Sequence, residues 1–346
     1  MTTSDVFDQG VDCHIYEGRN TVVRVILGNA KSFILKQWPL APDGKPQSAF
    51  LTESWCYAFS ERPNNLDDQK PFFPRLLFRD SPNCVLGIEF LEHSERFLSF
   101  SPTASQIPAL SKLARHLSVW HSVANYREPF ADSPNILPVR MPWILRHVGA
   151  GGDALTPRNS SVAGILDFIA SHSDVVSRFS HLQQSRLPIC SIHGDLKTEN
   201  VLQLPDKHAQ DLRVAILDWE TACIGDPLWD LACVAESIAR AAVFSSPSRL
   251  GLSCLAAFRE ALHQCSAASN INAFLGAYAS CGTLPFEVVE NCESDLAKYT
   301  GARMLQWTIE ATTITEDIDP SVSLYASLAC ALITEAETNG LSLSRG

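Results

Sequence analysis

The chain has 346 residues, of which 46% are hydrophobic and 19% are charged, and this balance excludes a disordered chain. Its 27 basic and 38 acidic residues give a formal net charge of −11, which argues against nucleic acid as the main partner, because phosphate binding needs a basic surface. A chain of this length predicts two lobes or domains.

The N-terminal part has patterns typical of β-strands. Residues 13–38 contain β-branched runs separated by turn signals at Gly18 and Gly28, which predicts a meander of about three antiparallel strands. The expected elements that follow are a helix at Ala49–Phe59 and two strands at Arg75–Phe78 and Val85–Leu91. This predicts a β-rich N-terminal lobe over residues 1–91.

Helical patterns dominate after residue 91. Apolar residues recur at helical spacing over Ile107–Val123 and Ile165–Phe179, and each stretch predicts one helix. Residues 124–160 between them contain several prolines and glycines, so we expect a long loop or an insertion there. The remaining expectations are a short strand at Leu212–Leu217 and helices from Leu228 onward, with breaks near Pro247, Gly282–Pro285 and Pro320. Residues 92–346 are therefore expected to form a mostly helical C-terminal lobe.

The cysteines and the N-terminus bear on the compartment. Eleven cysteines are an odd number and no two form a C-x-x-C pair, so neither a zinc motif nor a redox motif is expected. We interpret them as free thiols in a reducing compartment. The polar start MTTSDVFDQG does not resemble a signal peptide, and the longest apolar stretch, residues 322–333, is too short to span a bilayer. We expect a cytoplasmic protein without a membrane partner.

Three polar motifs concentrate the residues that could do chemistry. They are His193–Asn200 (HGDLKTEN), Ile216–Glu220 (ILDWE) and Gly225–Ala232 (GDPLWDLA). Phosphoryl transfer needs one carboxylate that orients and deprotonates a hydroxyl, oxygen ligands for Mg²⁺, and a cation on the phosphates. Asp195 can be that carboxylate, and Asn200 and Asp218 can supply the oxygens.

In this order and spacing, the three motifs resemble the aminoglycoside phosphotransferase and choline kinase-like superfamily, relatives of the protein kinases. Four upstream segments add to the resemblance. YEGRNTVVRV resembles the nucleotide-covering strand pair of the family, and FILKQW resembles the strand with the family lysine. LTESWCYAF resembles the helix whose Glu pairs with that lysine, and GIEFLE resembles the hinge. The resemblance implies an α+β, two-lobe protein-kinase-like fold.

The resemblance also implies roles for single residues. Asp195 would be the catalytic base, and Asn200 and Asp218 would bind Mg²⁺. Lys36 would contact the α- and β-phosphates of ATP or GTP and pair with Glu53. The implied nucleotide contacts are Gly18 in the covering loop and the backbone from Glu89 to Leu91, and the implied structural residues are His193 and Asp230.

The roles of two residues stay open. Lys197 stands two positions after the base, where Ser/Thr protein kinases have a lysine that contacts phosphate, so it is a candidate catalytic residue. Glu220 is either a carboxylate next to the metal or a plain surface acid.

The favoured function is an ATP-dependent phosphotransferase that acts on a hydroxyl of a small molecule, such as an aminoglycoside or an amino alcohol; the acidic net charge is compatible with a cationic acceptor. The alternatives are a kinase for Ser/Thr of a peptide, favoured by Lys197 and the 124–160 segment, and a nucleotide-binding module without turnover.

Overall fold

The computed structural model describes residues 11–16, 20–28, 31–60, 73–97, 103–122, 137–148, 159–184, 190–204, 212–245, 254–282, 293–313 and 318–339. The chain forms two compact units, each built from separate segments. The first unit comprises Met1–Arg96, Pro129–Leu137 and Asn200–Ala222, and the second comprises Phe97–Glu128, Pro138–Glu199 and Cys223–Gly346. A division into domains at residue 91 stays a prediction.

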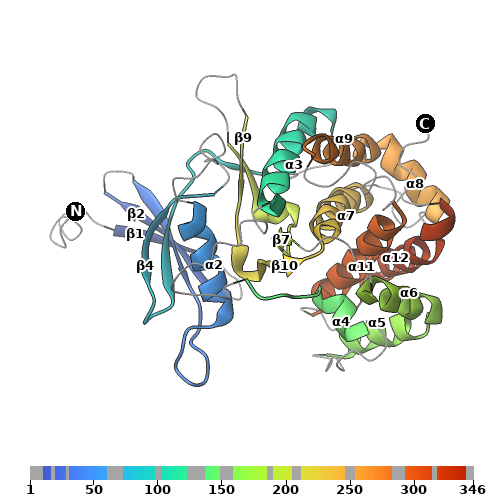
Figure 1. The fold of residues 1–346 in the computed structure, drawn as a ribbon, viewed down its shortest axis with the longest axis horizontal. Coiled ribbons are helices and arrows are strands. Elements are labelled where there is room, and N and C mark those ends of the chain that lie inside the picture. Colours follow the sequence, from blue (N-terminus) through green and yellow to red (C-terminus); the bar gives the residue numbers. More distant parts are fainter. Residues whose placement is uncertain are drawn as a thin grey trace. The chain divides into compact units, whose positions relative to one another are not determined.

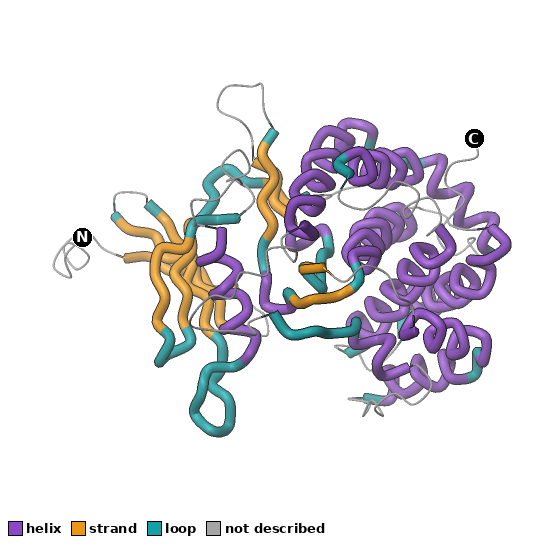
Figure 2. The backbone as a smooth tube through the Cα atoms, viewed as in Figure 1, coloured by secondary structure: helices purple, strands orange, loops and turns teal. Residues whose placement is uncertain are grey.

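Strands dominate the described part of the first unit and helices that of the second (Figures 1 and 2). This arrangement confirms the expected α+β, kinase-like fold class.

The first unit contains a five-stranded antiparallel sheet among its described residues, in the order β1-β2-β3-β5-β4. Its strands are β1 (Val11–Tyr16), β2 (Thr21–Leu27), β3 (Ser32–Gln37), β4 (Leu76–Asp80) and β5 (Val85–Glu89). The predicted meander and the following strand pair are thereby confirmed. On β3, Lys36 pairs with Val22 and Leu86, so these three side chains share one face of the sheet.

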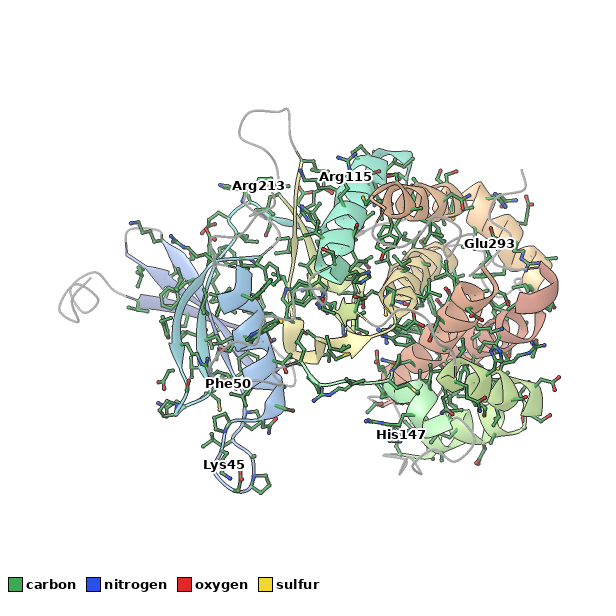
Figure 3. The ribbon with its side chains drawn as sticks, viewed as in Figure 1. Lys45, Phe50, Arg115, His147, Arg213 and Glu293 are labelled. Atoms are coloured by element: carbon green, nitrogen blue, oxygen red, sulfur yellow. The ribbon has the colours of Figure 1, made fainter. Side chains whose placement is uncertain are left out.

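Helix α2 (Ser48–Ser60) belongs to the same unit and is anchored by aromatic residues. Phe50, labelled in Figure 3, is fully buried, and its ring lies 5.6 Å from that of Trp38 at the end of β3. Tyr57 is buried on the same helix. This packing fixes the direction of the one acidic side chain of the helix, Glu53.

A hairpin completes the first unit. Its strands β8 (Val201–Leu204) and β9 (Arg213–Ile216) pair antiparallel, and β6 (Glu95–Arg96) joins β8. The hairpin is preceded by the 3₁₀ turn η4 (Thr198–Asn200) and followed by η5 (Trp219–Thr221). The indole of Trp219 is buried and stacks on Phe73 at 4.5 Å, and η5 packs against α2. The hairpin therefore delivers Asn200 and Asp218 to the first unit.

The second unit is built mainly from helices. They are η2 (Ala104–Gln106), α3 (Ile107–Ser122), α4 (Trp143–Val148), α5 (Ser160–Ala170), α6 (Ser173–Gln184), α7 (Pro227–Ser245), α8 (Leu255–Gln264), α9 (Ala267–Ser280), α11 (Glu293–Thr312) and α12 (Pro320–Asn339), with the short strand pair β7 (Cys190–Ile192) and β10 (Cys223–Gly225). Helix α11 packs against α7 and α12, and α3 packs against α9. No helix of the described ranges is long and apolar enough to cross a membrane.

Two expectations about helices were wrong. Ile165–Phe179 is not one helix, because α5 ends at Ala170 and α6 starts at Ser173. The carbonyl of Phe168 accepts a hydrogen bond from the Ser171 hydroxyl, and the Nδ1 atom of His172 lies 2.8 Å from it, while the His172 N–H bonds to Ile169 instead. These local side-chain contacts compete with the helical hydrogen bond and end the helix.

The 124–160 segment is also not a loop throughout. Its described residues include α4, whose Ile144 and Leu145 are buried. Just before α4, the N–H of Arg140 donates to the carbonyl of Ile224, and the N–H of Ile224 donates to the carbonyl of Pro138. An apolar pair and a β-bridge therefore anchor this stretch despite its prolines and glycines. The remaining residues of the segment, including the GAGGD sequence, lie outside the described ranges.

Candidate active site

Lys36, Glu53 and Asp218 meet in the first unit, as the resemblance implies. The Lys36 ammonium lies 2.6 Å from Glu53 Oε2 and also donates to Asp218 Oδ1. Glu53 is 1% exposed, whereas the side chain of Asp218 is 34% exposed. The lysine is thus held from behind by a buried acid, and from the front by an acid that solvent and ligands can reach.

The three charges alter each other. Burial lowers the pKa of Lys36, but Glu53 and Asp218 outweigh burial and leave that pKa above its ordinary value. Burial raises the pKa of Glu53 to about 7, although Lys36 acts in the opposite direction. Lys36 is therefore a cation throughout the neutral range, as a phosphate contact must be.

Glu220 is a third carboxylate of this cluster. Its Oε2 accepts hydrogen bonds from Asn20 Nδ2 at 2.7 Å and from Trp38 Nε1 at 2.9 Å, and it lies 3.8 Å from the Lys36 ammonium. Carboxylate oxygens of Glu53, Asp218 and Glu220 lie within 4.8 Å of one another, but the Lys36 ammonium contacts all three. In this arrangement the centre of the cluster suits an ammonium ion and not a metal ion.

The predicted metal ligands lie at the two ends of the β8–β9 hairpin. The Asn200 carbonyl accepts a 2.8 Å hydrogen bond from the Leu217 N–H, so Asn200 is beside the residue that precedes Asp218. Asp218 has φ +64° and ψ +54°, a left-handed conformation that Asp tolerates better than most residues. One carboxylate and one amide oxygen at neighbouring positions fit the sparse protein ligand set of nucleotide-bound Mg²⁺.

The loop with Asp195 lies in the second unit and is fixed from behind. Asp230 of α7 is fully buried, and its two oxygens accept the N–H groups of His193 at 2.7 Å and Gly194 at 2.9 Å. Gly194 has φ +84°, which glycine adopts without the strain of a side chain. His121 of α3 contacts Asp230 through Nε2 at 3.2 Å. These contacts set the backbone direction immediately before Asp195.

Asp195 is flanked by two cations. Its Oδ2 lies 3.0 Å from the Lys197 ammonium, and its Oδ1 lies 3.1 Å from Nη2 of Arg303 on α11. The Nη1 atom of Arg303 lies 3.1 Å from Glu310 Oε1. The Asp195 side chain is 19% exposed, while that of Arg303 is 0% exposed. The carboxylates of Asp195 and Glu310 thus balance the positive charges of Lys197 and Arg303.

Asp226 immediately precedes α7 in the second unit. Its Oδ1 accepts the Leu228 N–H and its Oδ2 accepts the Tyr299 hydroxyl, each at 2.9 Å. Burial raises the pKa of Asp226 to about 6, although both hydrogen bonds act to lower it. This acid therefore changes its charge near neutral pH.

The structure gives less support to the remaining predicted nucleotide contacts, at Gly18 and from Glu89 to Leu91. Glu89 lies at the end of β5, where its N–H already donates to the Arg75 carbonyl at 2.9 Å. The Leu91 carbonyl accepts the Ser94 N–H at 3.3 Å. Gly18 lies outside the described residues. The nucleobase contacts of this segment stay a prediction.

Sequence reasoning missed Arg303 and Glu310. Arg303 stands among apolar neighbours in GARMLQWTIEA, and a charged residue in such surroundings is usually buried with a partner. Glu310 follows seven positions later, on the same helical face. The spacing of seven could have predicted the pairing of Arg303 with Glu310, but it does not indicate Asp195 as the second partner of Arg303.

A model of the family described as "phosphotransferase enzyme family" matches residues 17–268 of the sequence. The match covers more than half of the chain. It includes the candidate base Asp195 and the candidate metal ligands Asn200 and Asp218. The chain belongs to the phosphotransferase enzyme family. This confirms the resemblance, and the protein is an enzyme of the phosphotransferase type.

Solved structures of this fold include several kinases of small molecules. Choline kinase LicA from Streptococcus pneumoniae is 14% identical, with 96% of each chain covered and a TM-score of 0.56. A microcompartment-associated aminopropanol kinase is 16% identical, with 97% of this chain and 95% of that chain covered and a TM-score of 0.57. An aminoglycoside 2'-phosphotransferase variant in complex with GDP is 14% identical, with 96% and 92% covered and a TM-score of 0.50. At this identity the likeness establishes the fold.

No functionally curated protein matches the sequence at a significant level.

Proposed function

We propose that this phosphotransferase moves the γ-phosphoryl group of ATP or GTP to a hydroxyl of a small molecule of the amino-alcohol or aminoglycoside type. The observation that carries the proposal is the environment of Asp195. It is a partly exposed carboxylate on a loop that Asp230 braces, with Lys197 at one of its oxygens. A general base needs this combination of access and fixed orientation.

The nucleotide would bind at the cluster of the first unit. The Lys36 ammonium exchanges its contact with Asp218 for oxygens of the α- and β-phosphates, while Glu53 continues to hold it. Asn200 and Asp218 would hold the Mg²⁺ of the bound nucleotide, and this ion would neutralise charge on the phosphates. Structural relatives in complex with AMP and GDP support nucleotide binding by this fold.

Proton transfer would fall to Asp195. Its Oδ2 accepts the proton of the acceptor hydroxyl as the hydroxyl oxygen attacks the γ-phosphorus and the bond to the leaving nucleoside diphosphate breaks. Lys197, whose side chain is 30% exposed, leaves Oδ2 and contacts the transferring phosphoryl group. Positioning and electrostatic stabilisation supply most of the rate in such reactions.

The acceptor class rests on relatives and charge. The structural relatives are named as kinases or phosphotransferases of choline, ethanolamine, aminopropanol and aminoglycosides, all of which combine a hydroxyl with a cationic nitrogen. The net charge of −11 favours the approach of such cations. A peptide acceptor remains the second candidate, because Lys197 lies within 3.0 Å of the base, as a phosphate-contacting lysine requires.

The test is nucleotide consumption with ATP and with GTP in the presence of Mg²⁺. Separate reactions contain an amino alcohol, an aminoglycoside, a Ser-containing peptide or no acceptor, and mass spectrometry identifies the phosphorylated product. The matched control is Asp195→Asn protein. Acceptor-dependent turnover by amino alcohols or aminoglycosides supports the proposal, and turnover with the peptide alone replaces it by the peptide-kinase reading. Tight nucleotide binding without any turnover would leave a nucleotide-binding module.

A further inference from the structure

Arg303 is the feature that the proposed reaction does not yet use. This arginine of α11 is fully buried, yet it contacts the candidate base: its Nη2 lies 3.1 Å from Asp195 Oδ1. Its Nη1 lies 3.1 Å from Glu310 Oε1, and Gln306 donates to that same oxygen at 2.9 Å. The guanidinium is therefore held by its own helix, with one of its nitrogens beside the carboxylate.

The two oxygens of Asp195 face cations of different mobility. Oδ2 faces Lys197, which is 30% exposed and lies on the loop. Oδ1 faces Arg303, which is 0% exposed and lies in the middle of a long helix. A lysine on a flexible stem can change partners, whereas a buried guanidinium keeps its place and its charge. Only Oδ2 can thus become available to a substrate while Oδ1 stays held.

Fold stability alone does not account for the arginine. Its Nε and Nη2 atoms are buried and donate no hydrogen bond to the described residues, and the Nη2 contact with Asp195 is an ion pair. Buried ion pairs are weak contributors to stability, because desolvation opposes them, and unsatisfied buried donors add to that cost. A role in the reaction explains why such a group lies beside the base.

We propose that Arg303 is a positioning residue for Asp195: it holds Oδ1, so that Oδ2 is the oxygen that takes the proton from the acceptor hydroxyl. The inference rests on the proposed function. The buried guanidinium contacts neither nucleotide nor acceptor, and it keeps its charge throughout. Oδ2 gains the proton, the acceptor oxygen gains the phosphorus, and the nucleoside diphosphate leaves with the electrons of the broken bond.

The first test is Arg303→Gln, with Arg240→Gln as the matched control. Arg240 of α7 also lies between two carboxylates, at 2.8 Å from Glu199 and 3.0 Å from Glu236, and its side chain is 14% exposed. We expect Arg303→Gln to lower kcat about 10²-fold with the nucleotide KM within about twofold, since the loss falls on a group that acts in the transition state. Arg240→Gln lowers the melting temperature without this selective loss in kcat. Equal losses of kcat in both variants would overturn the inference.

A second test separates positioning from a merely structural role. In an Asp195→Asn background, Arg303→Gln should change the residual rate less than about threefold, because residues that act as a unit are not additive. Rates are normalised to the nucleotide-binding sites counted by calorimetry. If the two losses multiply, Arg303 does not act through Asp195 and the proposal is wrong.

Should Arg303→Gln fail to fold, Arg303→Lys takes its place in both tests. It keeps a point charge but not the guanidinium fork, and we expect a smaller loss in kcat, of about tenfold. Wild-type kcat in whichever of the two variants folds would overturn the inference. Failure of the proposed function is a different result: the unmodified protein would then bind or turn over no nucleotide at all.

Discussion

The indole Nε1 of Trp38 donates a 2.9 Å hydrogen bond to Oε2 of Glu220, across 182 residues of sequence. The same oxygen accepts from Asn20 at the start of β2. Glu220 therefore ties η5 to two strands of the sheet that carries Lys36. This use of the carboxylate favours a bracing role over direct binding of the metal.

Glu220→Gln tests that role. The remaining amide oxygen can still accept from Trp38, so we expect Mg²⁺-nucleotide affinity within about twofold of the unmodified protein. Glu220→Ala leaves the buried indole N–H without an acceptor and should cost about 1–3 kcal/mol of folding free energy. Calorimetric titration and chemical denaturation measure the two effects. An affinity loss of tenfold or more in Glu220→Gln would make Glu220 a metal ligand.

Asp195→Asn should keep the fold and nucleotide binding but lower turnover by roughly three orders of magnitude or more, because an amide cannot accept the proton. Steady-state kinetics with the best acceptor of the screen measures the loss, and calorimetry with the nucleotide provides the control. Full activity in this variant would remove Asp195 as the base.

Asp218→Asn should weaken the binding of Mg²⁺-nucleotide by about tenfold or more, since Asp218 is the charged member of the two proposed protein ligands of Mg²⁺. Asn also tolerates the left-handed backbone at this position, so the fold should be unchanged. Asp218→Ala adds backbone strain and should lower the melting temperature as well. Unchanged affinity for Mg²⁺-nucleotide in Asp218→Asn would rule out this residue as the ligand.

Lys197→Met separates a phosphoryl contact from a solvated lysine. If Lys197 stabilises charge in the transition state, kcat falls roughly 10²-fold while the nucleotide KM stays nearly constant. If it is only an exposed partner of Asp195, both parameters stay within about twofold. A selective loss of kcat would support the phosphoryl contact and keep peptide acceptors in the screen beside small molecules. Unchanged kinetics would remove the main support for peptide acceptors.

Asp226 predicts a pH dependence of stability. Its pKa rises on folding from about 3.8 to about 6 because of burial, so the folded state binds more protons between these values and stability falls as the pH rises through this window. In Asp226→Asn the amide oxygen can still accept the Leu228 N–H and the amide NH₂ can donate to the Tyr299 oxygen, and the titration is removed. Relative to this variant, the unmodified protein should lose about 2 kcal/mol between pH 4 and pH 6.5, measured by urea denaturation. A constant difference between the two proteins would contradict the assignment.

Local sequence patterns predicted the parts of the fold that local patterns can determine. The strands β1 to β5 and the helices α2 and α3 have clear periodicity, and the motif around Asp195 is continuous in sequence. Strands β7 and β10 have three residues each, which is too short for any periodicity to appear. The break at Ser171 depends on side chains that compete for one carbonyl, and hydrophobic spacing contains no sign of it.

The candidate site also contains residues that the sequence indicates and residues that only the structure reveals. Lys36, Glu53 and Asp218 were found through a resemblance that fixes their order, and the structure brings them into contact. The contacts of Glu220 with Asn20 and Trp38, and of Arg303 with Asp195, join residues that are far apart in sequence. Their contacts depend on how whole elements pack, and a single sequence does not contain that information in readable form.

The segmented first unit has a consequence for synthesis of the chain. The sheet and α2 can form once the ribosome has released residues up to Arg96, but η5, which packs against α2, lies between Asn200 and Ala222. At about 5–20 residues per second, the interval is roughly ten seconds. During that time Lys36 has Glu53 but lacks Asp218 and Glu220, and the Trp38 indole lacks its acceptor. A nascent chain of this protein therefore passes through a stage, open to chaperones, in which the carboxylate cluster around Lys36 is half assembled.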